Sequence, residues 1–481
     1  MAGTSSRADG LSKTLTWRDG FAIALVIPNG LLLTVGYAIG AIGGWTAIAI
    51  WVVGALVGFL QNQLFAEMAA MLPDLSGGVS RYAAEAWKRY FAPLGAVASF
   101  GYWIGWSFSI AVNAAAIGAL VQSQWFSHAS GGISLLGRHV GLPEAIAILA
   151  IAGGWAANYF GARLSAKANK IMALVVLAGL LVIMTVPLFK AGGWQLHRLT
   201  WAHGTTWMTV VVWFYVTAWT TYGTEICASF APEYRDTVRD TSKALRMTSL
   251  VSIALFVVVP MALTGPVGEQ AIAANPVSAF ALAFEHALGG WSSLGVLILV
   301  ASMFLGMVST TADGARALYG LARERMTVRQ LDKVNRWGVP GRALTLDAVI
   351  NGLIVLLLGE PLSILVASNL GYIVAITLAV AAFLLFRKDR PELARPIKRS
   401  AGWIPIAWAI LAFDLAVLII GATHPSLAGY GGAKETLAGI GILLVAVLLF
   451  LYRQVVQERQ PLQWRVREDI ADVREREQHR I

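Results

Sequence analysis

Five consecutive residues in the first hydrophobic segment combine backbone properties that suit anion binding. They are Ile27, Pro28, Asn29, Gly30 and Leu31, and apolar runs lie on both sides of them. Proline lacks an amide hydrogen and Asn-Gly favours a turn, so a membrane-crossing helix is expected to break here. The free N–H groups that begin the following half-helix carry the positive end of its dipole, which suits a carboxylate. The stretch therefore predicts a carboxylate-binding site, or else a proline kink packed against neighbouring helices.

A second weakened stretch lies midway through the hydrophobic segment 206–231. Its residues are Trp219, Thr220, Thr221, Tyr222 and Gly223. Threonine hydroxyls compete for backbone carbonyls, and glycine is entropically costly in a helix. Interrupted segments at matching positions in two halves of a chain are typical of a transporter site built on inverted repeats. We therefore predict that the two stretches meet and hold a small solute near the middle of the membrane.

The composition indicates a membrane protein. The chain has 481 residues, of which 57% are hydrophobic and 13% charged, whereas soluble domains are about 25% charged. Its mean hydropathy is +0.65. The polar first 17 residues predict an N-terminal segment rather than a cleavable signal peptide. With a single cysteine, Cys227, the sequence offers no intrachain disulfide and no multi-cysteine metal site, and we expect no metal and no cofactor.

Twelve apolar segments are each close to the ~20 residues that a helix needs to cross a bilayer. They are 19–43, 46–71, 93–125, 142–160, 171–189, 206–231, 247–266, 289–312, 344–359, 362–386, 403–421 and 436–452. We expect an all-α polytopic membrane protein in which helices 1–5 and 6–10 form two inverted repeats and helices 11–12 are peripheral. Residues 1–18 then form a cytoplasmic N-terminal segment, residues 19–452 the transporter domain, and residues 453–481 a charged cytoplasmic tail.

The distribution of basic residues predicts the orientation. Four of the 37 Lys and Arg residues, namely Arg138, Lys190, Arg198 and Lys434, fall in the connections on one side of the predicted membrane. All the others fall at the termini or in the connections on the opposite side. Because Lys and Arg are enriched in cytoplasmic loops, we expect a multi-pass protein of the plasma (inner) membrane with both termini cytoplasmic. The net charge of +10 is thus a topology signal, and no nucleic-acid partner is expected.

Charged residues inside membrane segments are candidates for function. Four carboxylates qualify: Glu67, Glu225, Asp313 and Asp414. Glu67 and Asp313 are interpreted as carboxylates near the cytoplasmic interface. Glu225 and Asp414 are candidates for a proton relay, and Asp414 could equally belong to a structural pair.

Three longer motifs follow the second, sixth and eighth predicted helices. The first runs from Glu67 to Tyr82 and reads EMAAMLPDLSGGVSRY. The second is YGTE at 222–225, followed by FAPEYRD at 230–236. The third is ARALYGLAR at 315–323, with GVP at 338–340.

These motifs resemble those of the amino acid–polyamine–organocation (APC) permeases, and the resemblance extends over about residues 11–452. It implies the five-plus-five inverted-repeat (LeuT-like) fold with two additional C-terminal helices. It also implies that N–H groups at Gly30 and Leu31 bind a substrate carboxylate, while carbonyls around Trp219 to Tyr222 face its amine. Trp219 would be a gating aromatic or, alternatively, an ordinary packing residue. Helix 3 would contribute the face from Tyr102 to Ser109, where Gly105 and Ser109 stand one turn apart.

Ion coupling stays open at this stage. Sodium-coupled relatives use hydroxyls of the eighth helix, for which Ser309, Thr310 and Thr311 are the candidates. Proton-coupled relatives carry a lysine in the fifth helix, where this chain has Val176. Uncoupled exchange, or proton coupling through another carboxylate, is the alternative.

The predicted function is secondary transport of an amino acid or a small amine by alternating access. No phosphate-binding loop of the GxxxxGK[ST] type is present to use ATP. A polyamine, organocation or drug-handling transporter on the same scaffold is the alternative. An integral-membrane enzyme is not expected, because the sequence has neither an HExxH nor a GxSxG motif. The expected partners are a small-molecule substrate, the lipid bilayer and either a proton or sodium.

Overall fold

The computed structural model describes residues 13, 15–24, 29–73, 75, 77–135, 138–160, 178–179, 181–190, 193–201 and 205–466. Of residues 22, 23, 29 and 138 it describes the backbone only. Two of the predicted site residues, Ile27 and Pro28, lie outside the described part, as do residues 171–177 and 180 of the predicted segment 171–189.

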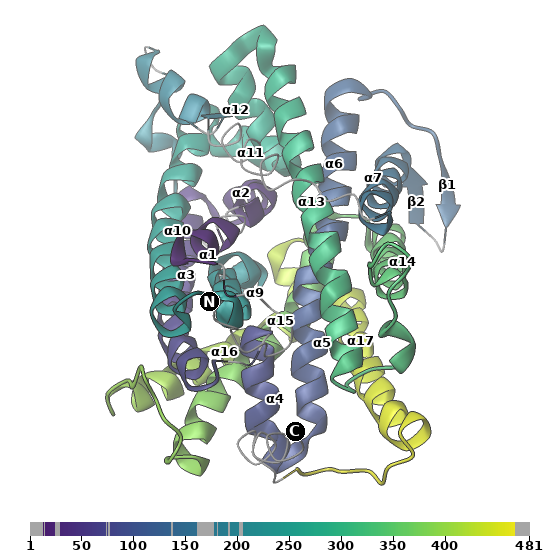
Figure 1. The fold of residues 1–481 in the computed structure, drawn as a ribbon. Helices are drawn as coiled ribbons and strands as arrows, with labels where there is room; N and C mark the ends of the chain where they lie inside the picture. Colours follow the sequence, from purple (N-terminus) through teal and green to yellow (C-terminus); the bar gives the residue numbers. More distant parts are fainter. Residues whose placement is uncertain are drawn as a thin grey trace, which may run out of the picture.

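The described chain is almost entirely helical (Figure 1). Its α-helices are α1 (Trp17–Ala24), α2 (Asn29–Ile42), α3 (Gly44–Met71), α4 (Gly78–Phe91), α5 (Pro93–Ser107), α6 (Ser109–Trp125), α7 (Leu142–Tyr159), α9 (Trp207–Tyr222), α10 (Thr237–Val267), α11 (Glu269–Ala274), α12 (Ala279–Leu288), α13 (Ser292–Arg323), α14 (Gly341–Leu358), α15 (Pro361–Asp389), α16 (Trp403–Thr423) and α17 (Ala433–Tyr452). Strands β1 (Gly132–Leu135) and β2 (Arg138–Gly141) pair as an antiparallel hairpin, with Gly132 opposite Gly141.

Short helices of other types connect these elements. They are η1 (Val186–Phe189), η2 (Leu196–Arg198), η3 (Gly223–Glu233), η4 (Pro276–Ser278), η5 (Gly289–Trp291), η6 (Arg329–Leu331), η7 (Pro425–Ala428) and the π-helical turn η8 (Arg453–Gln457). The longest of them, η3, continues directly from α9 and contains Pro232.

Eight helical stretches of the described chain are long and apolar enough to cross a membrane. They are Gly44–Met71, Pro93–Trp125, Thr237–Val267, Pro276–Arg323, Gly341–Leu358, Pro361–Asp389, Trp403–Thr423 and Ala433–Gln457. Each overlaps one of the predicted apolar segments. The predicted segment 142–160 corresponds to α7, 19–43 is divided between α1 and α2, and 206–231 is divided between α9 and η3. The chain is thus a polytopic, all-α membrane protein.

The helices pack in two groups that α15 joins. In the first group α3 lies along α10, with α9, α2, α1 and η3 packed against them. The second group contains α5, α6, α7, α13 and α14, which pack against one another. α15 contacts α5 and α6 of the second group and α9 of the first group. It also packs against α4. Figure 1 shows α3 and α10 on one side of the molecule and α13, α14 and α7 on the other.

The outer surfaces of α16 and α17 are apolar. Trp408 and Ile419 on α16 and Leu444 and Leu448 on α17 are each more than half exposed. Large apolar side chains are stable on the outside of a membrane protein because they face lipid tails rather than water. These two helices therefore offer their outer faces to the bilayer.

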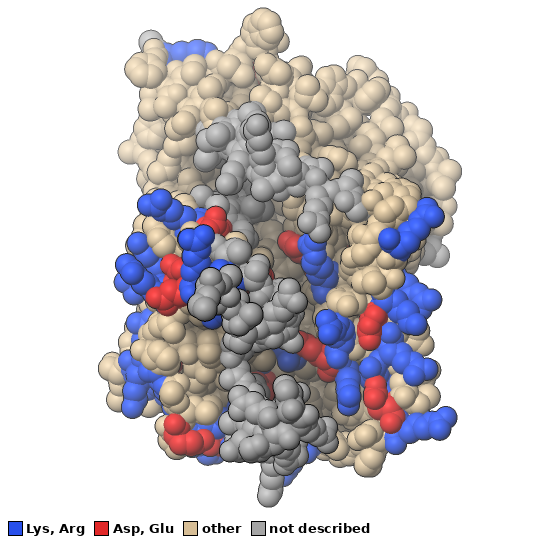
Figure 2. Space-filling view, viewed as in Figure 1, with Lys and Arg blue, Asp and Glu red and all other residues tan. Residues whose placement is uncertain are grey.

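Basic residues gather at one end of the molecule, which we call the basic end. Figure 2 shows Lys and Arg concentrated over the lower half of the visible face, whereas few lie on the upper half. Glu67, near the end of α3, is buried here and pairs with Arg387 of α15, with Nη2 and Oε2 2.6 Å apart. Arg395 lies 3.4 Å from the same carboxylate, and the backbone N–H of Arg399 donates to it over 2.7 Å. Glu67 thus ties the first group of helices to α15.

Candidate functional site

Gly30, in the first turn of α2, lies directly against α9. A Cβ atom placed on Gly30 would stand 2.6 Å from Cζ3 of Trp219 and 2.8 Å from Oγ1 of Thr220. Both distances are shorter than any normal contact, so only glycine allows α2 and α9 to approach this closely. The next residue, Leu31, is buried. The structure therefore brings the two predicted stretches of the sequence together.

The end of α9 is where helical geometry changes. α9 remains α-helical through Tyr222, and from Gly223 the chain continues as the tighter 3₁₀ helix η3. The hydroxyl of Thr221 donates to the Thr217 carbonyl over 3.1 Å, within α9. The expected weak point in this segment is thus present at Gly223, whereas Trp219 to Tyr222 are the last turn of a regular helix. The backbone of Trp219, Thr220 and Thr221 is therefore helical rather than unwound.

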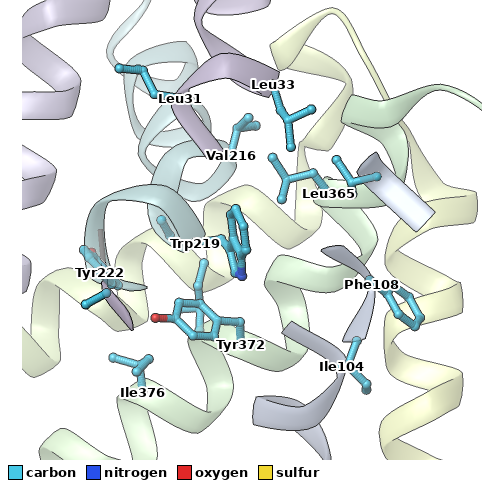
Figure 3. Packing of buried hydrophobic residues seen from close by; sticks show 14 of the residues in the cluster. Leu31, Leu33, Ile104, Phe108, Val216, Trp219, Tyr222, Leu365, Tyr372 and Ile376 are labelled. Carbon is cyan, nitrogen blue, oxygen red and sulfur yellow. The ribbon is translucent and has the colours of Figure 1, made fainter. Parts of the chain in front are cut away.

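Four aromatic side chains from three helices meet at this point, and we call them the aromatic cluster. They are Tyr102 and Trp106 of α5, Trp219 of α9 and Tyr372 of α15. The ring centroids of Trp106 and Trp219 are 5.6 Å apart, and those of Tyr102 and Tyr372 are 6.2 Å apart and stacked. Trp106 meets Tyr372 edge-on at 6.4 Å. Figure 3 shows Trp219 next to Tyr372, with Leu31 of α2 farther up.

Several buried polar atoms at the cluster have no hydrogen-bond partner among the described residues. These are the indole nitrogens of Trp106 and Trp219 and the hydroxyl of Thr220. Buried polar groups are nearly always hydrogen-bonded in native proteins, so each exception asks for an explanation. Trp219 and Thr220 lie against Gly30, and Trp106 meets Trp219, so these groups indicate a place where a polar ligand can supply the missing bonds.

A fully buried carboxylate lies beneath the cluster. The hydroxyl of Tyr372 donates to Oε1 of Glu225 over 2.9 Å, and Glu225 has no exposed surface. Its other oxygen, Oε2, has no hydrogen-bond partner within the described chain. The hydroxyl of Tyr102 lies 3.4 Å from that of Ser229, which is four residues after Glu225 in η3. The cluster and Glu225 are thus linked through a tyrosine.

A comparison with known families agrees with this architecture. Residues 15–452 match the family described as "Amino acid permease". The chain belongs to the amino acid permease family. Because the match covers nearly all of the described helices, the membership applies to the whole helical domain. The protein is therefore a transporter and not an enzyme.

Several characterised permeases are similar to this one. The amino-acid permease RocE of Bacillus subtilis is 25% identical over 344 residues, which cover 69% of this permease and 70% of RocE. The branched-chain amino acid permease BcaP of the same organism is 25% identical, covering 78% and 81% of the two chains. The lysine-specific permease LysP of Lactococcus lactis is 26% identical, covering 84% and 82%.

The two predicted residues of helix 3 lie behind the cluster in this permease. A Cβ on Gly105 would stand 2.7 Å from Cβ of Tyr372, so Gly105 lets α5 and α15 pack closely. The hydroxyl of Ser109 donates to the backbone carbonyl of Trp106 over 2.6 Å and is thereby occupied. Between Gly105 and Ser109, the residue that belongs to the aromatic cluster is Trp106.

The candidate sodium ligands bond to their own helix. Ser309 donates to the Leu305 carbonyl over 3.3 Å, and Thr310 and Thr311 donate to the Met307 carbonyl over 3.0 and 2.7 Å. Serine and threonine in helices commonly bond back in this way. A hydroxyl that donates to a carbonyl still has a free lone pair, but the arrangement needs no ion to explain it.

Asp414 joins three helices of the permease. Its carboxylate accepts hydrogen bonds from Nε2 of Gln61 on α3, at 3.1 and 3.0 Å, and from the hydroxyl of Tyr222, the last residue of α9, at 3.2 Å. Asp414 itself is on α16 and fully buried. With three donated contacts its carboxylate is well satisfied, which favours the structural alternative for this residue.

Sequence reasoning did not identify Trp106, Tyr372 or a further buried carboxylate, Asp347. Asp347 is on α14, within the predicted segment 344–359, and has no exposed surface. Its charge in an apolar segment was a signal that the sequence contained. Trp106 and Tyr372 carried no such signal, because aromatic residues are common in membrane helices and only the packing selects these two.

Proposed function

We propose that this permease carries an amino acid across the plasma membrane by alternating access, through a site between α2, α5, α9 and α15. The observation that carries the proposal is the direct approach of Gly30 to Trp219 and Thr220. Two separately weakened segments are in contact there, and three buried polar groups beside them lack partners. The two groups of helices joined by α15 provide bodies that can rock about this point.

The proposal includes the finer topology. The chain then has twelve membrane helices, with helices 1–5 and 6–10 as inverted repeats and helices 11–12 outside them. The family membership and the eight apolar spans of the described chain support this arrangement. Both termini then face the cytoplasm, because Lys and Arg gather at the basic end on the face that Figure 2 shows. Residues 1–18 and 453–481 are cytoplasmic segments in this arrangement.

In the proposed binding mode the substrate lies between the start of α2 and the aromatic cluster. Its carboxylate accepts hydrogen bonds from the N–H groups of Gly30 and Leu31, since the first turn of a helix leaves its amides without intrahelical acceptors. Its ammonium group lies over the rings of Trp219 and Trp106. A cation over an aromatic face gains about 0.5–2 kcal/mol. The last turn of α9 completes the wall, and the predicted residues Ile27 and Pro28 lie outside the described part of the chain.

A competition experiment tests this binding mode and distinguishes it from amine or drug transport. Purified permease in proteoliposomes should exchange at least one labelled amino acid from a panel in a saturable manner. Hydrogen bonds to a charged group contribute about 1.5–3 kcal/mol, so the decarboxylated amine should compete about 10- to 150-fold more weakly than its parent amino acid. Equal competition by the amine would instead favour a polyamine, organocation or drug-handling transporter.

We propose that sodium does not drive this transport and that Glu225 is the proton relay nearest the substrate. The free Oε2 of Glu225 can take up a proton, and Tyr372 connects it to the aromatic cluster. The sodium candidates already bond to the carbonyls of α13. Asp414 is the second relay candidate, but its hydrogen bonds to Gln61 and Tyr222 suit an anchor for α9.

Replacing external sodium by potassium or choline should therefore leave the initial rate of amino acid uptake unchanged. The measurement is uptake into proteoliposomes at constant pH and constant membrane potential. As a matched test, Thr310→Ala and Thr311→Ala should transport as well as the wild-type protein. A strict requirement for sodium, lost in both variants, would show instead that these hydroxyls bind the ion.

A further inference from the structure

Asp347 is a buried carboxylate outside the proposed substrate site. It lies in the second turn of α14 and has no exposed surface. Oδ1 accepts a hydrogen bond of 2.5 Å from the hydroxyl of Ser107. Oδ2 has no hydrogen-bond partner, and Asp347 forms no ion pair, among the residues that the structure describes.

The hydrogen bonds that reach Asp347 form a chain with a fixed direction. The backbone N–H of Ala111 donates to Oδ1 of Asn351 over 3.2 Å, which orients the amide. Nδ2 of Asn351 then donates to the hydroxyl of Ser107 over 2.9 Å. Because that hydroxyl accepts from Asn351, its own hydrogen points to Oδ1 of Asp347. Oδ1 is therefore an acceptor, and Oδ2 is the oxygen left to carry a proton.

This chain bridges the interruption between α5 and α6. α5 ends at Ser107 and α6 begins at Ser109, and the two donors Ser107 and Ala111 lie on either side of the break. The residue before Ser107 is Trp106, whose ring contacts Trp219. Asp347 is thus linked to the aromatic cluster by two steps, the hydrogen bond to Ser107 and the covalent bond from Ser107 to Trp106.

The surroundings of Oδ2 provide no positive charge. A Cβ on Gly314 of α13 would stand 2.5 Å from Oδ2, so the bare backbone of α13 covers this oxygen. On α5 the indole of Trp103 faces the carboxylate. The titratable and charged side chains on the elements around Asp347 are Tyr102 on α5; Asp313, Arg316, Tyr319 and Arg323 on α13; Glu144 and Tyr159 on α7; Arg342 on α14 itself; Arg329 on η6; and Tyr372, Arg387, Lys388 and Asp389 on α15. Within the described chain none of them forms an ion pair with Asp347, and Arg316 pairs with Asp313 at 3.5 Å.

We propose that Asp347 is a proton-binding site of the permease, protonated on Oδ2 in this packing and releasing its proton to water when the packing around it opens during the transport cycle. The inference rests on the proposed transport function. An ionised carboxylate buried without a cation is strongly disfavoured, whereas the neutral acid fits a site that offers the Ser107 hydroxyl, the Trp103 indole and no positive charge. Loss of the proton leaves a charge that Gly314 cannot satisfy, so deprotonation favours a state in which the site is open.

The test combines a direct readout of protonation with a transport measurement. Infrared difference spectra of the purified, full-length permease between acidic and alkaline pH should contain a carboxylic-acid C=O band that Asp347→Asn removes. Asp313→Asn, on the facing helix, is the matched control and should retain the band. In proteoliposomes, Asp347→Asn should keep amino acid exchange but lose accumulation driven by a pH gradient, because asparagine mimics the neutral acid permanently.

Each result decides the inference. A spectrum of Asp347→Asn identical to that of the wild type, or gradient-driven accumulation that persists in this variant, would overturn it. Loss of exchange together with accumulation would assign Asp347 a purely structural role and also overturn it. If Asp347→Asn cannot be purified, Ser107→Ala should shift the acid band to higher frequency, and an unshifted band counts against the site. Failure of the wild type to exchange any amino acid would defeat the proposed function, while the infrared result would still stand.

Discussion

Replacing Gly30 by valine is expected to abolish amino acid uptake without preventing assembly of the protein. The new Cβ would lie 2.6 Å from the Trp219 ring and 2.8 Å from the Thr220 hydroxyl, so α2 and α9 must move apart. The branched side chain would also cover the N–H groups that we propose bind the substrate carboxylate. Overpacking of this kind costs about 1–3 kcal/mol, so even Gly30→Ala should lower uptake by about 5- to 150-fold.

The control for Gly30→Val is the same substitution at Gly306 of α13. No atom lies within 4 Å of a Cβ placed there, so Gly306→Val should transport normally. Uptake is measured in proteoliposomes at matched protein content, and gel filtration in detergent checks that both variants are monodisperse. Normal uptake by Gly30→Val would show that the contact between α2 and α9 does not form the substrate site.

Much of the fold followed from local properties of the sequence. Each of the eight long apolar spans overlaps a predicted segment, because hydropathy over about 20 residues reports directly on burial in lipid. The ends of the helices were less well predicted. α10 begins at Thr237, ten residues before the predicted segment 247–266, and α13 continues to Arg323, beyond the predicted end at 312. These extra turns are polar, and hydropathy does not distinguish a polar helix that leaves the membrane from a loop.

The candidate site was predictable only where its chemistry is local. Gly30 and Gly223 stand out in the sequence because glycine within a membrane segment weakens the helix there. Tyr372 could not be recognised, because its role depends on α15 lying beside α5 and on the hydroxyl reaching Glu225. Ser109 stays a prediction, since its hydroxyl donates to the Trp106 carbonyl, a contact that the sequence did not indicate. Contacts between helices, rather than any property of one segment, decided these cases.

The second large effect is expected at Trp219. Trp219→Ala should abolish saturable uptake, because it removes both the ring that meets Trp106 and the contact surface of Gly30. Trp219→Phe keeps an aromatic face but a weaker one. The proposed cation–π contribution of about 0.5–2 kcal/mol corresponds to a factor of about 2 to 30 in KM. The KM of Trp219→Phe should rise by no more than this factor, with little change in maximal rate. Trp408→Ala, at an exposed position on α16, is the control and should transport normally.

Fluorinated tryptophans at position 219 separate the proposed role in binding from ordinary packing. Each fluorine withdraws electron density from the ring face and weakens its attraction for a cation, while the shape of the side chain hardly changes. If Trp219 binds the substrate ammonium group, substrate affinity should fall stepwise as fluorines are added, and the thermal stability of the protein should stay constant. If Trp219 only packs between α2 and α5, affinity should be independent of fluorination, and the loss of uptake in Trp219→Ala would be accompanied by a lower unfolding temperature. Stepwise loss of affinity at constant stability is the result that the unpartnered polar atoms around Trp219 lead us to expect.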